Sequence, residues 1–294
     1  MMGEASSGFD ADDLDGDVYV TPRYLAGSTP IGDPGLRPLR DLGWPLDHDD
    51  LGNCYVTSPD RRVRLGYLPE GEDDGLWRIS AYRDPHAAPV WGVCFNDKAP
   101  TEFVTAFTEA LAQGYTEGPE SYLPRLKGSS YDGLVPLIHN GWKLTRATAM
   151  DRTLEWTAPD KLAGVAYTTG DLDPEMEFTT LEARWFMWGG PKGWNRWYAT
   201  ASTETPISLV TAITAAIADP APALRWEQGM AKALREHAVL TPVRPAPPKA
   251  PTPLDVARAR PRALPSARTH SVPRWSTSTA PGWQLPAPTR RSGR

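Results

Sequence analysis

The feature that most constrains this chain is an internal repeat with an offset of about one hundred residues. Three motifs of the first half recur in the same order in the second half: residues 36–39 at 134–137, 57–60 at 157–160, and 100–107 at 206–213. The offset grows from 98 to 100 to 106, as small insertions in loops would require. A colinear series of matches is typical of a duplicated structural unit, so we predict two tandem copies of one fold.

Shorter matches support the same alignment. Gly43-Trp44 corresponds to Gly141-Trp142, again at an offset of 98. A weaker match pairs Pro22-Arg23 with Pro124-Arg125 at an offset of 102, out of step with its neighbours.

Each copy has the pattern of an antiparallel sheet with helices against one face. The predicted elements of the first copy are a strand over 18–25, a short helix ending at Gly43, strands near 54–57, 63–67, 76–82 and 90–95, and a closing helix from Pro100. Proline suits the first turn of a helix, and glycine suits the residue that ends one. The fold class is therefore α+β: two tandem repeats, each an antiparallel sheet packed with a short N-terminal and a longer C-terminal helix.

The ends of the chain differ from its body in composition. Residues 241–294 contain twelve of the 31 prolines and ten basic residues against one acid, a charge of +9. Because the whole chain carries −5, residues 1–240 carry −14. The predicted segments are an acidic disordered N-terminus (1–17), repeat 1 (18–118), repeat 2 (119–222), a segment with an amphipathic helix (223–240) and a basic Pro-rich disordered tail (241–294).

The start of the chain lacks the features of a secretory signal. Its first basic residue is Arg23, and residues 1–17 are acidic without an apolar stretch. A signal peptide needs a cationic start followed by an apolar run. We therefore expect a soluble, cytoplasmic protein.

The motifs of the two copies resemble a known domain. The start at 18–27, Ser58-Pro59-Asp60 with Tyr67, and the strand from Trp91 to Phe95 leading to Pro100 are similar to the actinobacterial SPDY domain, a domain of unknown function that often occurs as a tandem pair. The resemblance spans about 18–222. It implies the α+β repeat fold and no particular activity. The second copy has Ala158 in place of the motif serine, so that hydroxyl is not expected to be indispensable.

Acidic residues gather at the same predicted hairpin in both copies: Glu70, Glu72, Asp73 and Asp74 in the first, and Asp171, Asp173, Glu175 and Glu177 in the second. Paired carboxylates can act as acid and base or hold a metal. A solvated hairpin tip explains the same residues without function, and we favour it. A third possibility is that these loops attract a cationic partner.

Tryptophans and arginines supply the other candidate interaction residues. Trp188 and Trp194 lie near a glycine-rich connection in the second copy and could stack on bases or sugars if exposed, although strand alternation favours packing. The candidate residues of the tail are Arg258, Arg260, Arg262, Arg290 and Arg291, which could contact phosphates. Alternatively, the prolines of the tail could dock in an aromatic groove of a partner protein. A tail that binds nothing is the third possibility.

Histidine and cysteine give weak signals. Asp47-His48-Asp49-Asp50 combines a histidine with carboxylates, but a solvated loop is favoured over a metal site. Cys54 and Cys94 are too few for a disulfide scaffold. No base for a nucleophilic thiol is evident, so buried, inert thiols are expected.

A duplicated architecture without a duplicated catalytic set favours a non-enzymatic interaction module that binds a protein or peptide through the repeats. We expect no cofactor, no metal and no membrane partner. Two alternatives stay open: nucleic-acid binding through the basic tail, and a metal-assisted enzyme that uses the acidic hairpins.

Overall fold

The structure is a computed structural model that describes residues 16–29, 32–71, 74–124, 129–148, 152–179, 183–193 and 196–243, together with Thr252 and Arg258. The chain forms two compact units, residues 1–246 and 247–294. The predicted disordered ends fall almost entirely outside the described residues.

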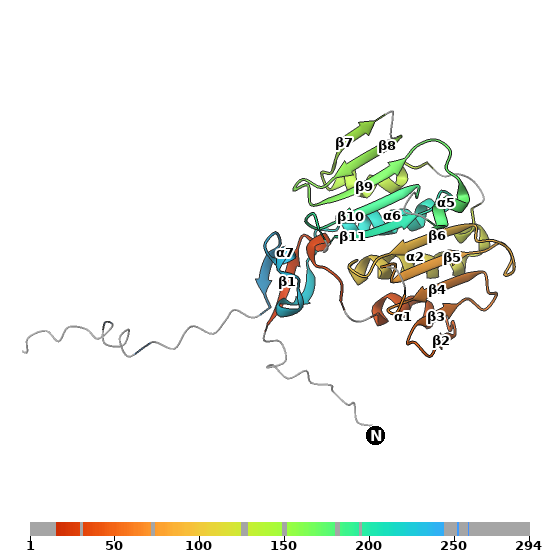
Figure 1. The fold of residues 1–294 in the computed structure, drawn as a ribbon, viewed down its shortest axis with the longest axis horizontal. Helices are drawn as coiled ribbons and strands as arrows, with labels where there is room; N and C mark the ends of the chain where they lie inside the picture. The colour runs from red at the N-terminus through yellow and green to blue at the C-terminus, as the bar shows by residue number, and fades with distance from the viewer. Residues whose placement is uncertain are drawn as a thin grey trace, which may run out of the picture. The chain divides into compact units, whose positions relative to one another are not determined.

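Within the described residues, ten antiparallel strands form one sheet, and each repeat contributes one half of it (Figure 1). Their order across the sheet is β2-β3-β4-β5-β6-β11-β10-β9-β8-β7. The bounds are β2 (Leu46–His48), β3 (Cys54–Thr57), β4 (Val63–Tyr67), β5 (Trp77–Ala81), β6 (Trp91–Phe95), β7 (Lys143–Thr148), β8 (Thr153–Thr157), β9 (Ala163–Thr168), β10 (Trp185–Gly189) and β11 (Trp197–Ala201).

Helices cover one face of this sheet (Figure 1). They are α1 (Asp33–Asp41) and α2 (Thr101–Glu117) in the first repeat, and α4 (Val135–His139) and α6 (Ile207–Ala218) in the second. Pro100 and Pro206 stand directly before α2 and α6, as predicted. Both helices bury their apolar stripe, so each repeat has the expected short N-terminal and longer C-terminal helix.

The two repeats meet at a pseudo-twofold axis between β6 and β11. Cys94 of β6 pairs with Thr200 of β11, and Thr200 occupies the position in the second repeat that Cys94 occupies in the first. The flanking bonds are duplicated as well. Asn96 N–H donates to the Tyr198 carbonyl (3.1 Å), and the equivalent Ser202 N–H donates to the Gly92 carbonyl (3.0 Å). One hydrophobic core therefore runs through both repeats.

The repeats also exchange a tyrosine across this axis. Trp197 Nε1 donates to the Tyr24 carbonyl and Trp91 Nε1 donates to the Tyr122 carbonyl, both at 2.8 Å. The Tyr24 hydroxyl donates to Asp160 (2.8 Å). Each repeat thus holds the opening segment of the other.

The second half of this exchange corrects the weaker sequence match. The Tyr122 hydroxyl donates to Asp60 (3.3 Å), so Tyr122 is the equivalent of Tyr24 at an offset of 98. The match of Pro22-Arg23 with Pro124-Arg125 at 102 was therefore wrong. The aspartate of the Ser-Pro-Asp motif and its counterpart Asp160 have a structural role as tyrosine acceptors.

The segment predicted to hold an amphipathic helix (223–240) does not form one helix: its ends join a separate three-stranded sheet, and only two short helices, η3 (Glu227–Gly229) and α7 (Lys232–Arg235), lie between them. β1 (Asp17–Thr21) lies between β12 (Ala223–Trp226) and β13 (Val239–Pro242). Burial in β12 alternates residue by residue, with Ala223 and Arg225 inside. This period of two belongs to a strand. Pairing with β1 and the buried guanidinium of Arg225 override the helical spacing of the apolar residues.

This small sheet also moves two predicted boundaries. Asp17 pairs with Trp226, and Pro242 pairs with Val18, so neither end of the sheet belongs to a disordered segment. The other short helices are η1 (Arg23–Leu25), α3 (Pro119–Tyr122), η2 (Asp132–Leu134) and α5 (Pro174–Thr179). Across the described part of the chain, no helix has the length and apolar character needed to span a membrane.

Candidate functional site

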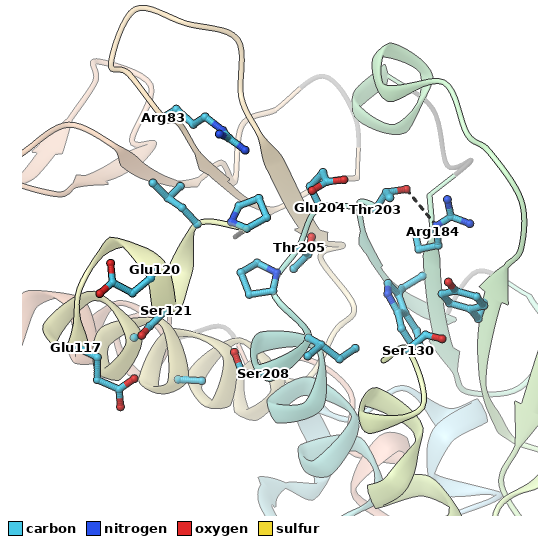
Figure 2. Close-up of a pocket in the computed structure, with 18 of the residues that line it drawn as sticks. Arg83, Glu117, Glu120, Ser121, Ser130, Arg184, Thr203, Glu204, Thr205 and Ser208 are labelled. Carbon is cyan, nitrogen blue, oxygen red and sulfur yellow. Dashed lines mark hydrogen bonds between the residues drawn. The ribbon is translucent and has the colours of Figure 1, made fainter. Parts of the chain in front are cut away.

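A groove of about 1130 Å³ lies between the two repeats on the helical side of the sheet. One wall comes from the C-terminal half of α2 and from α3, with Glu117, Glu120 and Ser121 (Figure 2). The opposite wall comes from the second repeat and includes Arg184. Ser208, at the start of α6, belongs to the floor.

Acidic side chains from both repeats outnumber basic ones in the lining. Glu117 comes from the first repeat, and Glu120, Asp171 and Glu204 come from the second. The cations are Arg83 and Arg184. Such a lining favours a cationic ligand through complementary charge.

Arg184 is held in place by its neighbours. Its Nε donates to Thr203 Oγ1 (3.1 Å), and its Nη1 donates to the Thr168 carbonyl. The guanidinium also lies over the ring of Tyr167. Glu177 fixes the other side of Thr203 by accepting hydrogen bonds from its backbone N–H and its hydroxyl. This wall of the groove is therefore preorganised.

On the other side of the pseudo-twofold axis, the residue equivalent to Ser208 is covered by another part of the chain. Glu102 of α2 is the equivalent of Ser208, and Arg225 of β12 bonds it with both guanidinium Nη atoms at 2.7 Å. The Arg225 side chain is only 6% exposed. It also donates to the Gly27 carbonyl. Arg225 of a β-strand thus covers Glu102, whereas the equivalent Ser208 lines the groove.

The second acidic connection differs from the predicted solvated hairpin tip because it contains helix α5. Asp171 lines the groove, Asp173 accepts a hydrogen bond from the Glu175 N–H at the start of α5, and Glu175 is exposed. Glu177 is buried against Thr203. One of the four predicted carboxylates therefore faces the groove, and another supports its wall.

The first acidic connection lies elsewhere. Asp74 accepts a hydrogen bond from the Tyr198 hydroxyl (2.5 Å), and Glu70 is exposed. Glu72 and Asp73 lie outside the described residues. Asp74 and Glu177 contact residues 198 and 203, five positions apart in β11 and its extension, or about 17 Å. The two connections do not converge, and no group of three metal-ligating side chains occurs among the described residues.

Only some of the tryptophans and arginines singled out from the sequence lie within the described residues. Trp185 and Trp197 are buried in the core, whereas Trp188 is half-buried on the other face of the sheet. Arg258 is exposed. The remaining candidates lie outside the described residues: Trp194, Arg260, Arg262, Arg290 and Arg291.

The contact between Cys54 and His48 was not predicted from the sequence. Cys54 Sγ lies 3.3 Å from His48 Nδ1 because the two residues face each other on β3 and β2. Burial, and then the charges of Asp33 and Asp49, raise the pKa of the Cys54 thiol, which disfavours a reactive thiolate. Both cysteines are half-buried, so the prediction of buried thiols was wrong. No strand was predicted at Leu46–His48, so the sequence contained no signal for this pairing.

The shared sheet and the exchanged tyrosines define the chain as a tandem-repeat α+β protein. The family model of the SPDY domain, a domain of unknown function (DUF317), matches residues 57–116 and 157–223. The chain therefore carries tandem SPDY domains, which confirms the resemblance. Comparisons with curated proteins and with solved structures gave no match.

Proposed function

We propose that this protein is a non-enzymatic interaction module whose groove between the repeats binds an extended, cationic peptide segment of a partner protein. The observation that carries the proposal is the occupied twin of the groove. There, an extended strand of the chain inserts Arg225 against Glu102. The fold therefore already contains one example of the interaction at an equivalent position.

The lining of the groove supports the same class of ligand. Glu117 and Glu120 on one wall and Asp171 on the other flank a floor that carries Ser208 and Ile207. Carboxylates on both sides of a partly apolar floor suit an extended segment that alternates arginine with apolar residues. The body charge of −14 steers such a segment toward the protein.

The test uses a fluorescein-labelled peptide with the sequence of residues 220–227, which contains Arg225, and measures its anisotropy on titration with the full chain. The double variant Glu117→Gln/Glu120→Gln should weaken binding about tenfold. Ser208→Glu should strengthen it, because it places a carboxylate where the first repeat has Glu102.

Glu109→Gln is the matched control, because Glu109 is an exposed acid of α2 outside the groove lining. A peptide with alanine in place of the arginine should bind poorly to every variant. The proposal fails if the peptide does not bind, or if the groove variants bind it with the affinity of Glu109→Gln.

The basic tail supports a second candidate, nucleic-acid binding. Its charge of +9 is separated by sequence from a body of −14, so phosphate contacts would have to come from the tail. Deleting residues 244–294 should then abolish binding of a double-stranded DNA fragment. Retention of the fragment after the deletion would refute this candidate.

A further inference from the structure

The face of the sheet opposite the main helices is lined by outward-pointing strand residues. Alternating burial and strand register place Arg78, Cys94, Thr200 and Phe186 in one row across four neighbouring strands. The four main helices α1, α2, α4 and α6 lie on the opposite face (Figure 1), and Phe178 of α5 lies over Gly92 on this one. We call it the bare face. It lies on the other side of the sheet from the groove.

The bare face differs between the repeats in its aromatic residues. The second repeat places Phe186, Trp188 and Tyr198 there. Strand pairing makes their equivalents Arg78, Ser80 and Gly92 in the first repeat. Packing of the shared fold therefore does not require these aromatic residues, because the first repeat forms the same strands without them.

The aromatic residues of the second repeat, with Phe178 of α5, form one surface, which we call the aromatic platform: Phe178, Phe186, Trp188 and Tyr198. The Phe186 and Tyr198 rings are nearly parallel, at 16°, with centroids 6.0 Å apart. Glycines make room for the outer two rings. A Cβ on Gly92 would lie 2.7 Å from the Phe178 ring, and one on Gly164 would lie 2.5 Å from the Trp188 ring.

Polar contacts hold the platform in position. Trp188 Nε1 donates to Glu155 (2.9 Å), and the Arg196 guanidinium lies 3.6 Å from the centroid of the same ring. The Tyr198 hydroxyl donates to Asp74. Trp188 is therefore covered on both faces, by Gly164 and by Arg196. Phe186 and Tyr198, both half-buried, are the rings placed to stack on a ligand.

The bare face is positive in a body of net negative charge. Four basic residues point outward from its strands against two acidic ones: Arg64, Arg78, Lys143 and Arg146 against Asp47 and Glu155. Beside the platform, Arg196 adds a cation over Trp188 and Asp74 adds a carboxylate at Tyr198, so the basic residues stay in excess. Arg78 lies three strand spacings from Phe186 along one row, or about 14 Å. Stacking rings and cations therefore lie within the reach of a few nucleotides.

We propose that the bare face binds single-stranded nucleic acid, with bases stacked on Phe186 and Tyr198 and phosphates held by Arg78 and its neighbours. Parallel aromatic rings on an open sheet stack bases of any sequence. Arginines beside them neutralise phosphates. This site is separate from the groove and from the basic tail, so its failure would leave the proposed peptide binding untouched.

The test measures the affinity of the full chain for a fluorescein-labelled ten-nucleotide thymidine strand and for an abasic strand of the same length. Phe186→Ala and Tyr198→Ala should each weaken binding of the thymidine strand about tenfold. Arg78→Ala should weaken it and reduce the salt dependence by about one phosphate contact. The abasic strand should bind weakly to every variant. Strands with photoreactive uracil should cross-link within residues 178–198.

Tyr131→Ala is the matched control, because Tyr131 is 69% exposed and precedes η2 on the helical side. Circular dichroism establishes that each variant is folded, and the milder Phe186→Leu provides a second variant without the ring. Failure of the thymidine strand to bind would overturn the proposal. So would equal affinity of the thymidine and abasic strands, because that result assigns binding to charge alone.

Discussion

The two faces of the central sheet have diverged to different degrees. On the helical face, the contacts that join the repeats are duplicated: Trp91 and Trp197 each donate to the carbonyl of an exchanged tyrosine. On the bare face, Arg78 and Ser80 of the first repeat stand opposite Phe186 and Trp188 of the second. Contacts kept in both copies are those that the fold needs. Residues that differ between equivalent positions are not required by the fold that the two copies share.

The groove shows the same contrast on the helical side. Its equivalent position is closed by Arg225 and Glu102, whereas Ser208 faces open space in the groove. The duplication therefore produced two similar positions, of which the chain fills one. Four predictions, from the largest expected effect to the smallest, test the distinction between kept and diverged positions.

The largest losses of stability should come from the duplicated tryptophans. Trp91→Ala and Trp197→Ala should each lower the free energy of unfolding by about 3–5 kcal/mol, because both rings are fully buried. Urea denaturation measures the effect. Phe186→Ala on the bare face serves as the comparison and should cost clearly less. Equal losses for all three would contradict the contrast between the faces.

Breaking the ion pair that closes the twin of the groove should have the next largest effect. Glu102→Gln should lower the free energy of unfolding by about 2 kcal/mol, since Arg225 loses a charged partner. Burial raises the pKa of Glu102, but the hydrogen bonds and charge of Arg225 outweigh it and hold the pKa below its usual value.

The pair should therefore stabilise the protein above the ordinary glutamate pKa of about 4.3. Its contribution should disappear as the pH falls through the lower pKa of the folded state. Urea denaturation of wild type and Glu102→Gln between pH 6 and pH 3 checks this. A constant difference across that range would argue against the pair, and Glu109→Gln should show none.

The two exchanged tyrosines should contribute equally to the free energy of unfolding, and each should contribute less than the Arg225–Glu102 pair. Tyr24→Phe and Tyr122→Phe should each cost about 1 kcal/mol, because each loses a hydrogen bond to an aspartate. Burial and the charge of Asp60 raise the pKa of Tyr122 to about 12. Its contribution should be complete below the ordinary pKa of about 10 and lost as the pH rises through about 12.

Thermal unfolding of wild type and Tyr122→Phe between pH 8 and pH 12 measures this dependence. The difference between the two proteins should narrow as the pH rises. If only one of the two substitutions lowers the free energy of unfolding, the exchange is not energetically symmetric.

The smallest effect should come from exposed positions that diverged. Val135 and Ile138 are 40% and 46% exposed, and their equivalents Arg37 and Arg40 are exposed as well. Val135→Arg/Ile138→Arg should therefore change the free energy of unfolding by no more than about 0.5 kcal/mol. Leu137→Arg, at a fully buried position between them, is the control and should prevent folding.

Much of the fold could be predicted because its signals are local. Proline before α2 and α6, glycine at the ends of α1 and α4, and alternation in the strands each depend on a few neighbouring residues. Gly43 and Gly141 do have positive φ angles, as the end of a helix requires. The constant order of the repeated motifs was enough to align the two halves, because this alignment does not depend on contacts between them.

The candidate sites could not be predicted in the same way. The segment 223–238 has helical spacing of its apolar residues, yet pairing with β1 makes Ala223–Trp226 a strand. Asp171 and Glu117 are far apart in sequence and meet only because the two repeats join edge to edge. Trp188 was recognised as a candidate, but its partners Glu155 and Arg196 depend on strand register.

The sequence by itself determined the duplication, the α+β character and the main strands and helices of each repeat, because turn residues and hydrophobic period act over short distances. Only the tertiary structure decided that β6 and β11 join the halves into one sheet. That junction places Tyr24 and Tyr122 in each other's repeat. It also leaves one groove open and its twin closed by Arg225, because pairing between distant strands has no local signal in the chain.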